Sequence, residues 1–75
     1  MKHQINKEIG KRLKYKRQIL RITQKQLAQE LGVTPQQIQK YEKGMDAIPI
    51  FRLVKTMKIF NVNANYFINQ KFFRK

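Results

Sequence analysis

Apolar side chains recur at helical spacing over the first third of the chain. Ile5, Ile9 and Leu13 lie on one face, and either Arg17 or Leu20 continues it. The lysines between them fall mostly on other faces: Lys7, Lys11, Lys14 and Lys16. This pattern predicts a helix from Ile5 to about Leu20.

The periodicity continues over a shorter segment with clear ends. Thr23 is a favourable N-cap, because its hydroxyl oxygen can accept a hydrogen bond from a backbone N–H of the first turn. Gly32 is suited to the left-handed position that closes a helix. The apolar residues between these ends form one stripe: Leu27, Ala28 and Leu31. A helix from Gln24 to Leu31 is therefore predicted.

A third helical segment follows at once. Thr34 provides a hydroxyl cap, and Pro35 stands at the first helical position, where its missing N–H removes no hydrogen bond. Ile38 and Tyr41 are apolar at the expected inner positions. The expected outer positions are polar: Gln36, Gln37 and Lys40. We predict a helix from Pro35 to about Lys43.

The second half of the chain contains two further helical segments. Gly44, Asp46 and Pro49 indicate a loop over 45–49. A helix from Ile50 to Phe60 is predicted by an apolar stripe of Phe51, Val54, Met57 and Phe60, with Leu53 alongside. Asn63 can cap a short fifth helix that carries Tyr66, Phe67 and Ile68.

These segments predict an all-α fold, a compact bundle of five helices. The chain has 75 residues, enough for one small core but not for two. We therefore expect a single domain over residues 1–75, with its core at about 5–68 and a basic, aromatic tail at 69–75.

The charge of the chain narrows the possible partners. Lys and Arg total 17 against 4 Asp and Glu, a formal net charge of +13, and such a domain repels itself unless a polyanion is its partner. Nucleic acid is the first expectation and an anionic membrane surface the second. No apolar run reaches the length of a membrane span, so an intracellular, soluble protein is expected.

Catalysis and metal binding find little support in the composition. The chain has no cysteine, which excludes disulfides and thiolate metal sites. Its single histidine, His3, has no second ligand within reach by spacing, and four carboxylates form no catalytic constellation. We expect no enzymatic activity, no metal and no cofactor.

The spacing of the second and third helices is typical of a helix-turn-helix motif. Ala28 lets two helices approach closely, Gly32 can take a positive φ in the turn, and Ile38 pins the second helix. With these residues the chain resembles the Cro/phage-repressor (Xre-like) family from about Ile9 to Ile68. The resemblance implies a lambda repressor-like bundle of five helices. It also implies that the helix over 35–43 enters the major groove of DNA.

The resemblance assigns DNA base reading to four residues around that helix: Thr34, Gln36, Gln37 and Lys40. Glutamine can pair with adenine through its acceptor and its donor, whereas lysine can address guanine O6 and N7. Pro35 stands where some relatives have a base-reading glutamine. The operator preference of those relatives therefore does not transfer to this chain.

The resemblance also implies residues that hold the DNA backbone and the motif itself. The implied phosphate-binding residues are Thr23, Gln24, Lys25, Lys43 and Gly44, the last through its backbone amide. Arg17 and Glu42 match a pair that forms a buried salt bridge in related domains. Arg21 and Asn61 replace common glycines, and asparagine tolerates the left-handed conformation better than arginine does.

Several aromatic residues are expected to have a structural role. Tyr41 and Phe51 are expected in the core or at its rim rather than as stacking platforms for bases. The end of the chain has more aromatic residues than a small monomer needs: Tyr66, Phe67, Phe72 and Phe73. Part of that surface is therefore expected to contact a second subunit.

The resulting hypothesis is a sequence-specific regulator of transcription, a repressor, that binds double-stranded DNA in the cytoplasm of a prokaryotic or phage-infected cell. A homodimer joined by the fourth and fifth helices and the tail would bind an inverted repeat. The main alternative is an antitoxin-type interaction module with autoregulatory DNA binding. A cationic membrane-active peptide and an RNA-binding domain are weaker alternatives, because the helices are short and no sheet is predicted.

Overall fold

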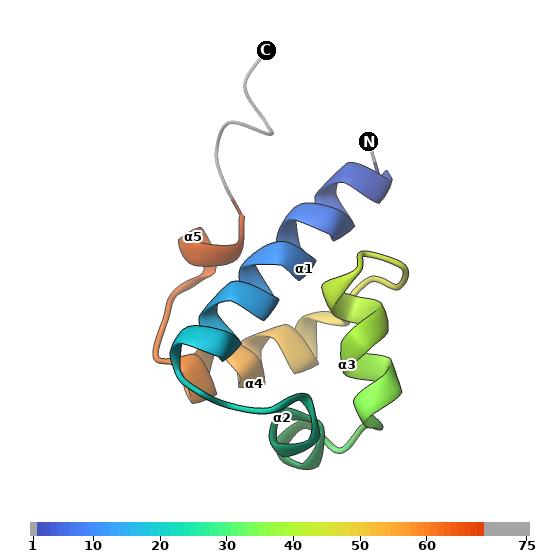
Figure 1. Ribbon diagram of the computed structural model, residues 1–75. Helices are drawn as coiled ribbons and strands as arrows, with labels where there is room; N and C mark the ends of the chain where they lie inside the picture. The colour runs from blue at the N-terminus through green and yellow to red at the C-terminus, as the bar shows by residue number, and fades with distance from the viewer. Residues whose placement is uncertain (1, 69–75) are drawn as a thin grey trace.

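The computed structural model describes residues 2–68, and over this range it confirms the all-α fold with five helices. They are α1 (Lys2–Ile19), α2 (Gln24–Leu31), α3 (Pro35–Glu42), α4 (Ile50–Phe60) and α5 (Ala64–Phe67) (Figure 1). Three boundaries differ from the prediction. α1 begins at Lys2 rather than Ile5, α3 ends at Glu42 with Lys43 as its C-cap, and α5 ends at Phe67 with Ile68 as its C-cap. The predicted tail, with Phe72 and Phe73, lies outside the described residues.

The ends of the helices follow from local side-chain chemistry. The Thr23 hydroxyl accepts from the Gln26 backbone N–H at 3.0 Å, and the Gln26 side chain accepts from the Thr23 N–H at 2.8 Å. This reciprocal capping box starts α2. Gly32, with φ of 71°, closes α2 in the left-handed conformation. Arg21 and Asn61 also have positive φ, 60° and 55°, as expected where they replace glycines.

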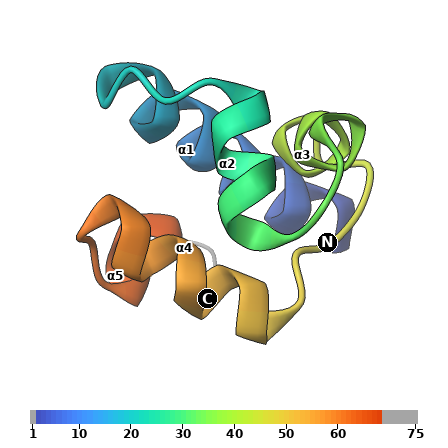
Figure 2. The ribbon, with the colours of Figure 1, turned by 90° about the horizontal axis from the view of Figure 1, so that it is seen from below.

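The helices surround one core, with α3 on one side of α1 and α5 on the other (Figure 1). In the view of Figure 2, α4 and α5 occupy the lower part of the picture and α1, α2 and α3 the upper part. The buried apolar residues come from all five described helices: Leu13, Leu27, Ala28, Leu31, Ile38, Tyr41, Leu53, Phe60 and Phe67. In α1 the inner position beyond Leu13 is held by Arg17, whereas Leu20 is 41% exposed.

The predicted apolar stripe of α4 is wrong at its first two positions. Phe51 is 66% exposed and Val54 38% exposed, so Phe51 is neither core nor rim. The later part of the stripe is confirmed, because Phe60 is buried and Met57 packs against the core. Leu53 and Thr56 are the other buried residues of α4. Thr56 can be fully buried because its hydroxyl donates to the Arg52 carbonyl at 2.8 Å, one turn earlier.

The aromatic residues of α5 pack inward. Phe67 is fully buried, with its ring centroid 6.4 Å from that of Phe60 and 5.1 Å from that of Tyr66. Phe67 is therefore not available to the subunit contact that was expected on part of this aromatic surface. Its ring completes the core of the domain against α4, and Tyr66 is half-buried beside it.

A glycine that sequence reasoning did not single out sets the distance between α1 and α3. Gly10 is buried in the middle of α1, and a Cβ atom placed there would lie 2.3 Å from the Tyr41 carbonyl oxygen and 2.6 Å from that of Glu42. No side chain fits this position. The end of α3 can therefore pack directly against the backbone of α1.

Candidate nucleic-acid interface

The third helix lies at the edge of the bundle (Figures 1 and 2). Beyond its first residue, its exposed side chains are polar. Its inner face is anchored by Ile38 and Tyr41, which are buried. Gln36 and Lys40 are exposed, as is Thr34 at the N-cap, and Gln37 is half-buried. Lys40 is four residues from Gln36 and three from Gln37, so these predicted base-reading side chains share one face of the helix.

Two of these residues have partners within the chain. The Thr34 hydroxyl oxygen accepts from the Gln37 backbone N–H at 3.1 Å and so caps α3. The Gln37 side-chain amide donates to the Asp46 carboxylate at 3.0 Å. Thr34 keeps its hydroxyl proton as a donor. Gln37 keeps its amide oxygen and one N–H, because only one of its hydrogens is used.

A small cavity joins two of the predicted phosphate-binding residues. It measures about 90 Å³ and is lined by Lys14, Gln24, Gln39, Glu42 and Lys43, which come from α1, α2 and the end of α3. Gln24 and Lys43 thus lie at one site. The sequence pattern places Lys14 off the apolar face of α1 without assigning it a partner, and the packing of three helices brings it to this cavity.

The remaining predicted phosphate-binding residues differ in what they can offer. Lys25 is exposed near the start of α2. Thr23 is exposed, but its backbone N–H is already bonded within the capping box. Gly44 is buried, and its N–H donates to the Tyr41 carbonyl at 3.1 Å. The expectation that the Gly44 amide binds a phosphate therefore needs correction, because that donor is already used.

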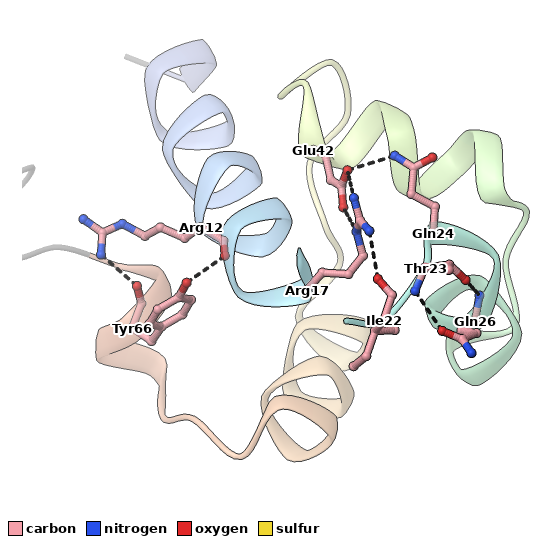
Figure 3. A network of polar contacts seen from close by, with 8 residues as sticks. All are labelled: Arg12, Arg17, Ile22, Thr23, Gln24, Gln26, Glu42 and Tyr66. Carbon is pink, nitrogen blue, oxygen red and sulfur yellow. Dashed lines mark hydrogen bonds and ion pairs between the residues drawn. The ribbon is translucent and has the colours of Figure 1, made fainter. Parts of the chain in front are cut away.

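A buried ion pair holds the end of α3 against α1 (Figure 3). Arg17 Nε donates to Glu42 Oε2 at 2.5 Å and Nη2 donates to Oε1 at 3.2 Å, a bidentate arrangement. The side chains are 10% and 3% exposed. Arg17 Nη1 also donates to the Ile22 carbonyl at 2.8 Å, which fixes the turn between α1 and α2.

Gln24 extends this network toward the surface. Its side-chain Nε2 donates to Glu42 Oε1 at 2.9 Å (Figure 3). The Glu42 carboxylate thus accepts hydrogen bonds from two helices, from Arg17 of α1 and from Gln24 of α2. Gln24, a predicted phosphate-binding residue, is therefore hydrogen-bonded to the ion pair that holds the end of α3.

A second network ties α1 to α5, away from α3. The Tyr66 hydroxyl donates to the Arg12 carbonyl at 2.9 Å, and Arg12 Nη1 donates to the Tyr66 carbonyl at 3.0 Å (Figure 3). Burial raises the pKa of the Tyr66 phenol above its ordinary value of 10.0, although the nearby Arg12 charge opposes the shift. This reciprocal pair is structural and does not face the polar side of α3.

None of the helices within residues 2–68 combines the length and the apolar character needed to cross a membrane.

Comparison with known proteins identifies the family. The profile of the helix-turn-helix family HTH_3 matches residues 13–67. Three relatives illustrate the similarity. An uncharacterized HTH-type transcriptional regulator of Rhizobium meliloti is 40% identical over 63 residues, which is 84% of this chain and 45% of the relative. An uncharacterized transcriptional regulator in the ATPase CF(0) region of Rhodospirillum rubrum is 37% identical over 67 residues, 89% of this chain and 62% of the relative.

The third relative is an uncharacterized HTH-type transcriptional regulator of Rickettsia conorii, 38% identical over 63 residues, which is 84% of this chain and 50% of the relative. The chain thus spans about half the length of the relatives it matches. The segment matched by the family profile includes Arg17, both helices of the motif, Glu42 and α5. The chain belongs to the Cro/phage-repressor (Xre-like) family of helix-turn-helix transcriptional regulators.

Proposed function

We propose that this domain binds double-stranded DNA in a sequence-specific manner and regulates transcription from the cytoplasm, with α3 in the major groove. The observation that carries the proposal is the polar face of α3, where Gln36, Gln37 and Lys40 project from a helix held by a buried ion pair. A helix fits the major groove, and amide side chains can read base edges there. The relatives named as transcriptional regulators support the same function.

The cavity between α1, α2 and α3 supports a backbone contact beside the reading helix. Lys14 and Lys43 bring positive charge to it, and Gln24 adds an amide. The Glu42 carboxylate also lines it, but its charge is paired with Arg17. Contacts of this kind fix the register of a protein on DNA without reading its sequence. We assign phosphate binding to Gln24, Lys25 and Lys43, with Thr23 contributing through its hydroxyl proton.

The proposed regulator is a repressor that acts as a homodimer on an inverted repeat. A dimer places its two reading helices about 34 Å apart on one face of the duplex. The exposed apolar residues of α4 support a subunit contact on that helix: Ile50, Phe51 and Val54. Such a dimer bound over a promoter would block the polymerase sterically, which requires no further activity of the domain.

Selection of binding sites from a random duplex library near physiological salt tests the proposal, because charge-driven background falls steeply with salt. We expect an enriched inverted repeat. Gln36→Ala and Gln37→Ala should each relax one position of that repeat. Gln29→Ala, an exposed glutamine of α2, is the matched control and should leave the selected sequence unchanged.

Failure of the selection would have a definite meaning. Binding that enriches no sequence and simply fades as salt rises would show that net charge alone holds DNA. The interaction-module function would then become the leading one.

Sedimentation of the free protein and of its DNA complex tests the dimer separately, since a monomer in both states contradicts it. Phe51→Ser should weaken self-association without unfolding the domain, because Phe51 is 66% exposed.

A further inference from the structure

An acidic side chain lies against the reading face of α3 in a chain that is strongly basic. Asp46, in the loop after α3, accepts a hydrogen bond from Gln37 Nε2 at 3.0 Å. The chain has 4 acidic residues in all, and two of them, Glu8 and Glu42, are paired with arginines. Asp46 is exposed, and the group that donates to it is a neutral amide.

The chemistry of this pair fixes which way the Gln37 amide faces. An ionised carboxylate can only accept hydrogen bonds, so the amide must turn its NH₂ group toward Asp46. Its oxygen and its second N–H then remain available. These are the acceptor and the donor that adenine's N6 and N7 require. A free glutamine could turn its amide over, whereas a glutamine bonded to Asp46 presents one arrangement.

The backbone around the loop holds Asp46 at this place. The Gly44 N–H donates to the Tyr41 carbonyl at 3.1 Å, and the Met45 N–H donates to the Lys40 carbonyl at 2.9 Å. Gly44 has φ of 73°, and a Cβ atom there would lie 2.7 Å from Lys7 Cα. The loop is therefore folded back on the end of α3 before any ligand arrives.

On the basis of the proposed function, we propose that Asp46 is a specificity-determining residue that positions Gln37 for one base pair. In water this exposed hydrogen bond contributes little to folding, since both groups have solvent as an alternative. In the groove, where water is excluded, the same bond strengthens. The carboxylate also repels phosphates, so it lowers sequence-independent binding. Both effects raise the ratio of specific to non-specific affinity.

The test compares Asp46→Asn with Glu30→Gln in the site selection described above. Each change removes one negative charge. Glu30 is the control because it is exposed and lies on α2, whereas Gln37 lies on α3. Asparagine can both donate and accept, so it no longer forces one orientation of the Gln37 amide. We expect Asp46→Asn to reduce discrimination about tenfold at one base pair per half-site, the pair that Gln37→Ala also relaxes. Glu30→Gln should preserve the selected sequence.

The double variant Asp46→Asn/Gln37→Ala tests whether Asp46 acts through Gln37. If Asp46 acts through Gln37, the double variant should select the same sequence as Gln37→Ala alone. In the free protein, Asp46→Asn should shift the side-chain amide NMR signals of Gln37, and Glu30→Gln should not. Thermal unfolding should be unchanged in both single variants, because both positions are exposed.

The outcomes separate the two proposals. An enriched repeat for the wild type, with the same repeat and the same discrimination for Asp46→Asn, overturns the role of Asp46 and leaves the proposed function intact. If Asp46→Asn and Glu30→Gln both bind all DNA sequences more tightly by the same factor, the role of Asp46 is also overturned. The loss of one negative charge would then explain the effect. If the wild type enriches no sequence, the proposed function fails and the role of Asp46 fails with it.

Discussion

The guanidinium of Arg17 and the carboxylate of Glu42 face each other in a bidentate pair that joins α1 to the end of α3, with Nε and Oε2 2.5 Å apart. Both side chains are almost fully buried. A pair in this position costs free energy to desolvate, and its geometry must compensate through additional hydrogen bonds. The Ile22 carbonyl and the Gln24 amide supply them. The position of α3 against α1 thus depends on this buried charge pair.

Glu42→Ala should therefore weaken DNA binding through folding. Removal of the carboxylate leaves the Arg17 charge buried without its partner, which costs about 3–5 kcal/mol of unfolding free energy. Urea unfolding measures this loss. Glu8→Ala is the control, because Glu8 pairs with Arg12 where both side chains are partly exposed, 24% and 29%, and it should cost less than about 1 kcal/mol. Normal thermal stability in Glu42→Ala would contradict the structural role of the pair.

Helix ends and the core of the motif could be predicted from the sequence because their signals are local. Thr23, Thr34 and Gly32 act within one turn of their own helix, and the structure has them at the predicted caps. The buried face of α4 could be predicted only in part this way. Most of its residues are apolar, so more than one face fits a helical stripe. Thr56 is polar and lies outside the predicted stripe, but it can be buried because its hydroxyl donates to the Arg52 carbonyl.

Gly10→Ala should destabilise the domain although alanine is the better helix former. The added Cβ would meet backbone carbonyl oxygens at 2.3 and 2.6 Å, and backbone cannot move aside as a flexible side chain can. We expect a loss of about 1–3 kcal/mol, as for overpacking in a core. Gln18→Ala, at an exposed position of α1, is the control and should be neutral. An increase in stability of about 1 kcal/mol, the intrinsic helix preference alone, would show that α1 and α3 can separate freely.

The candidate site was only partly predictable for a related reason. The polar face of α3 follows from its own periodicity, so Gln36 and Lys40 were predicted at exposed positions. Lys14 and Asp46 join the site through tertiary packing and a folded-back loop, and neither has a periodic signal that distinguishes it. The internal use of the Gly44 N–H depends likewise on the turn that follows α3.

Tyr66→Phe should cost stability at neutral pH and less at high pH. The variant loses the hydrogen bond from the phenol to the Arg12 carbonyl, worth about 1 kcal/mol. Burial raises the pKa of the Tyr66 phenol in the folded state, so the wild type holds its proton more tightly when folded. That contribution is complete below the ordinary pKa of 10.0 and is lost as pH rises through it toward the folded value.

Urea unfolding of the wild type and Tyr66→Phe at several pH values checks this expectation. The difference in unfolding free energy should be constant up to about pH 9 and should narrow above pH 10. Tyr15→Phe is the control at neutral pH and should leave stability unchanged, because Tyr15 is 63% exposed. A difference that stays constant or grows at high pH would contradict a raised pKa for Tyr66.

Lys43→Ala should change the salt dependence of DNA binding and leave its sequence preference alone. Each phosphate that a lysine neutralises adds about 0.9 to the slope of log affinity against log salt concentration. The slope should therefore fall by about 1 in Lys43→Ala, and also in Lys14→Ala if the shared cavity seats a phosphate. Lys55→Ala, at an exposed position of α4, is the control. An unchanged slope in Lys14→Ala with a reduced slope in Lys43→Ala would place the phosphate outside the cavity, at the end of α3 alone.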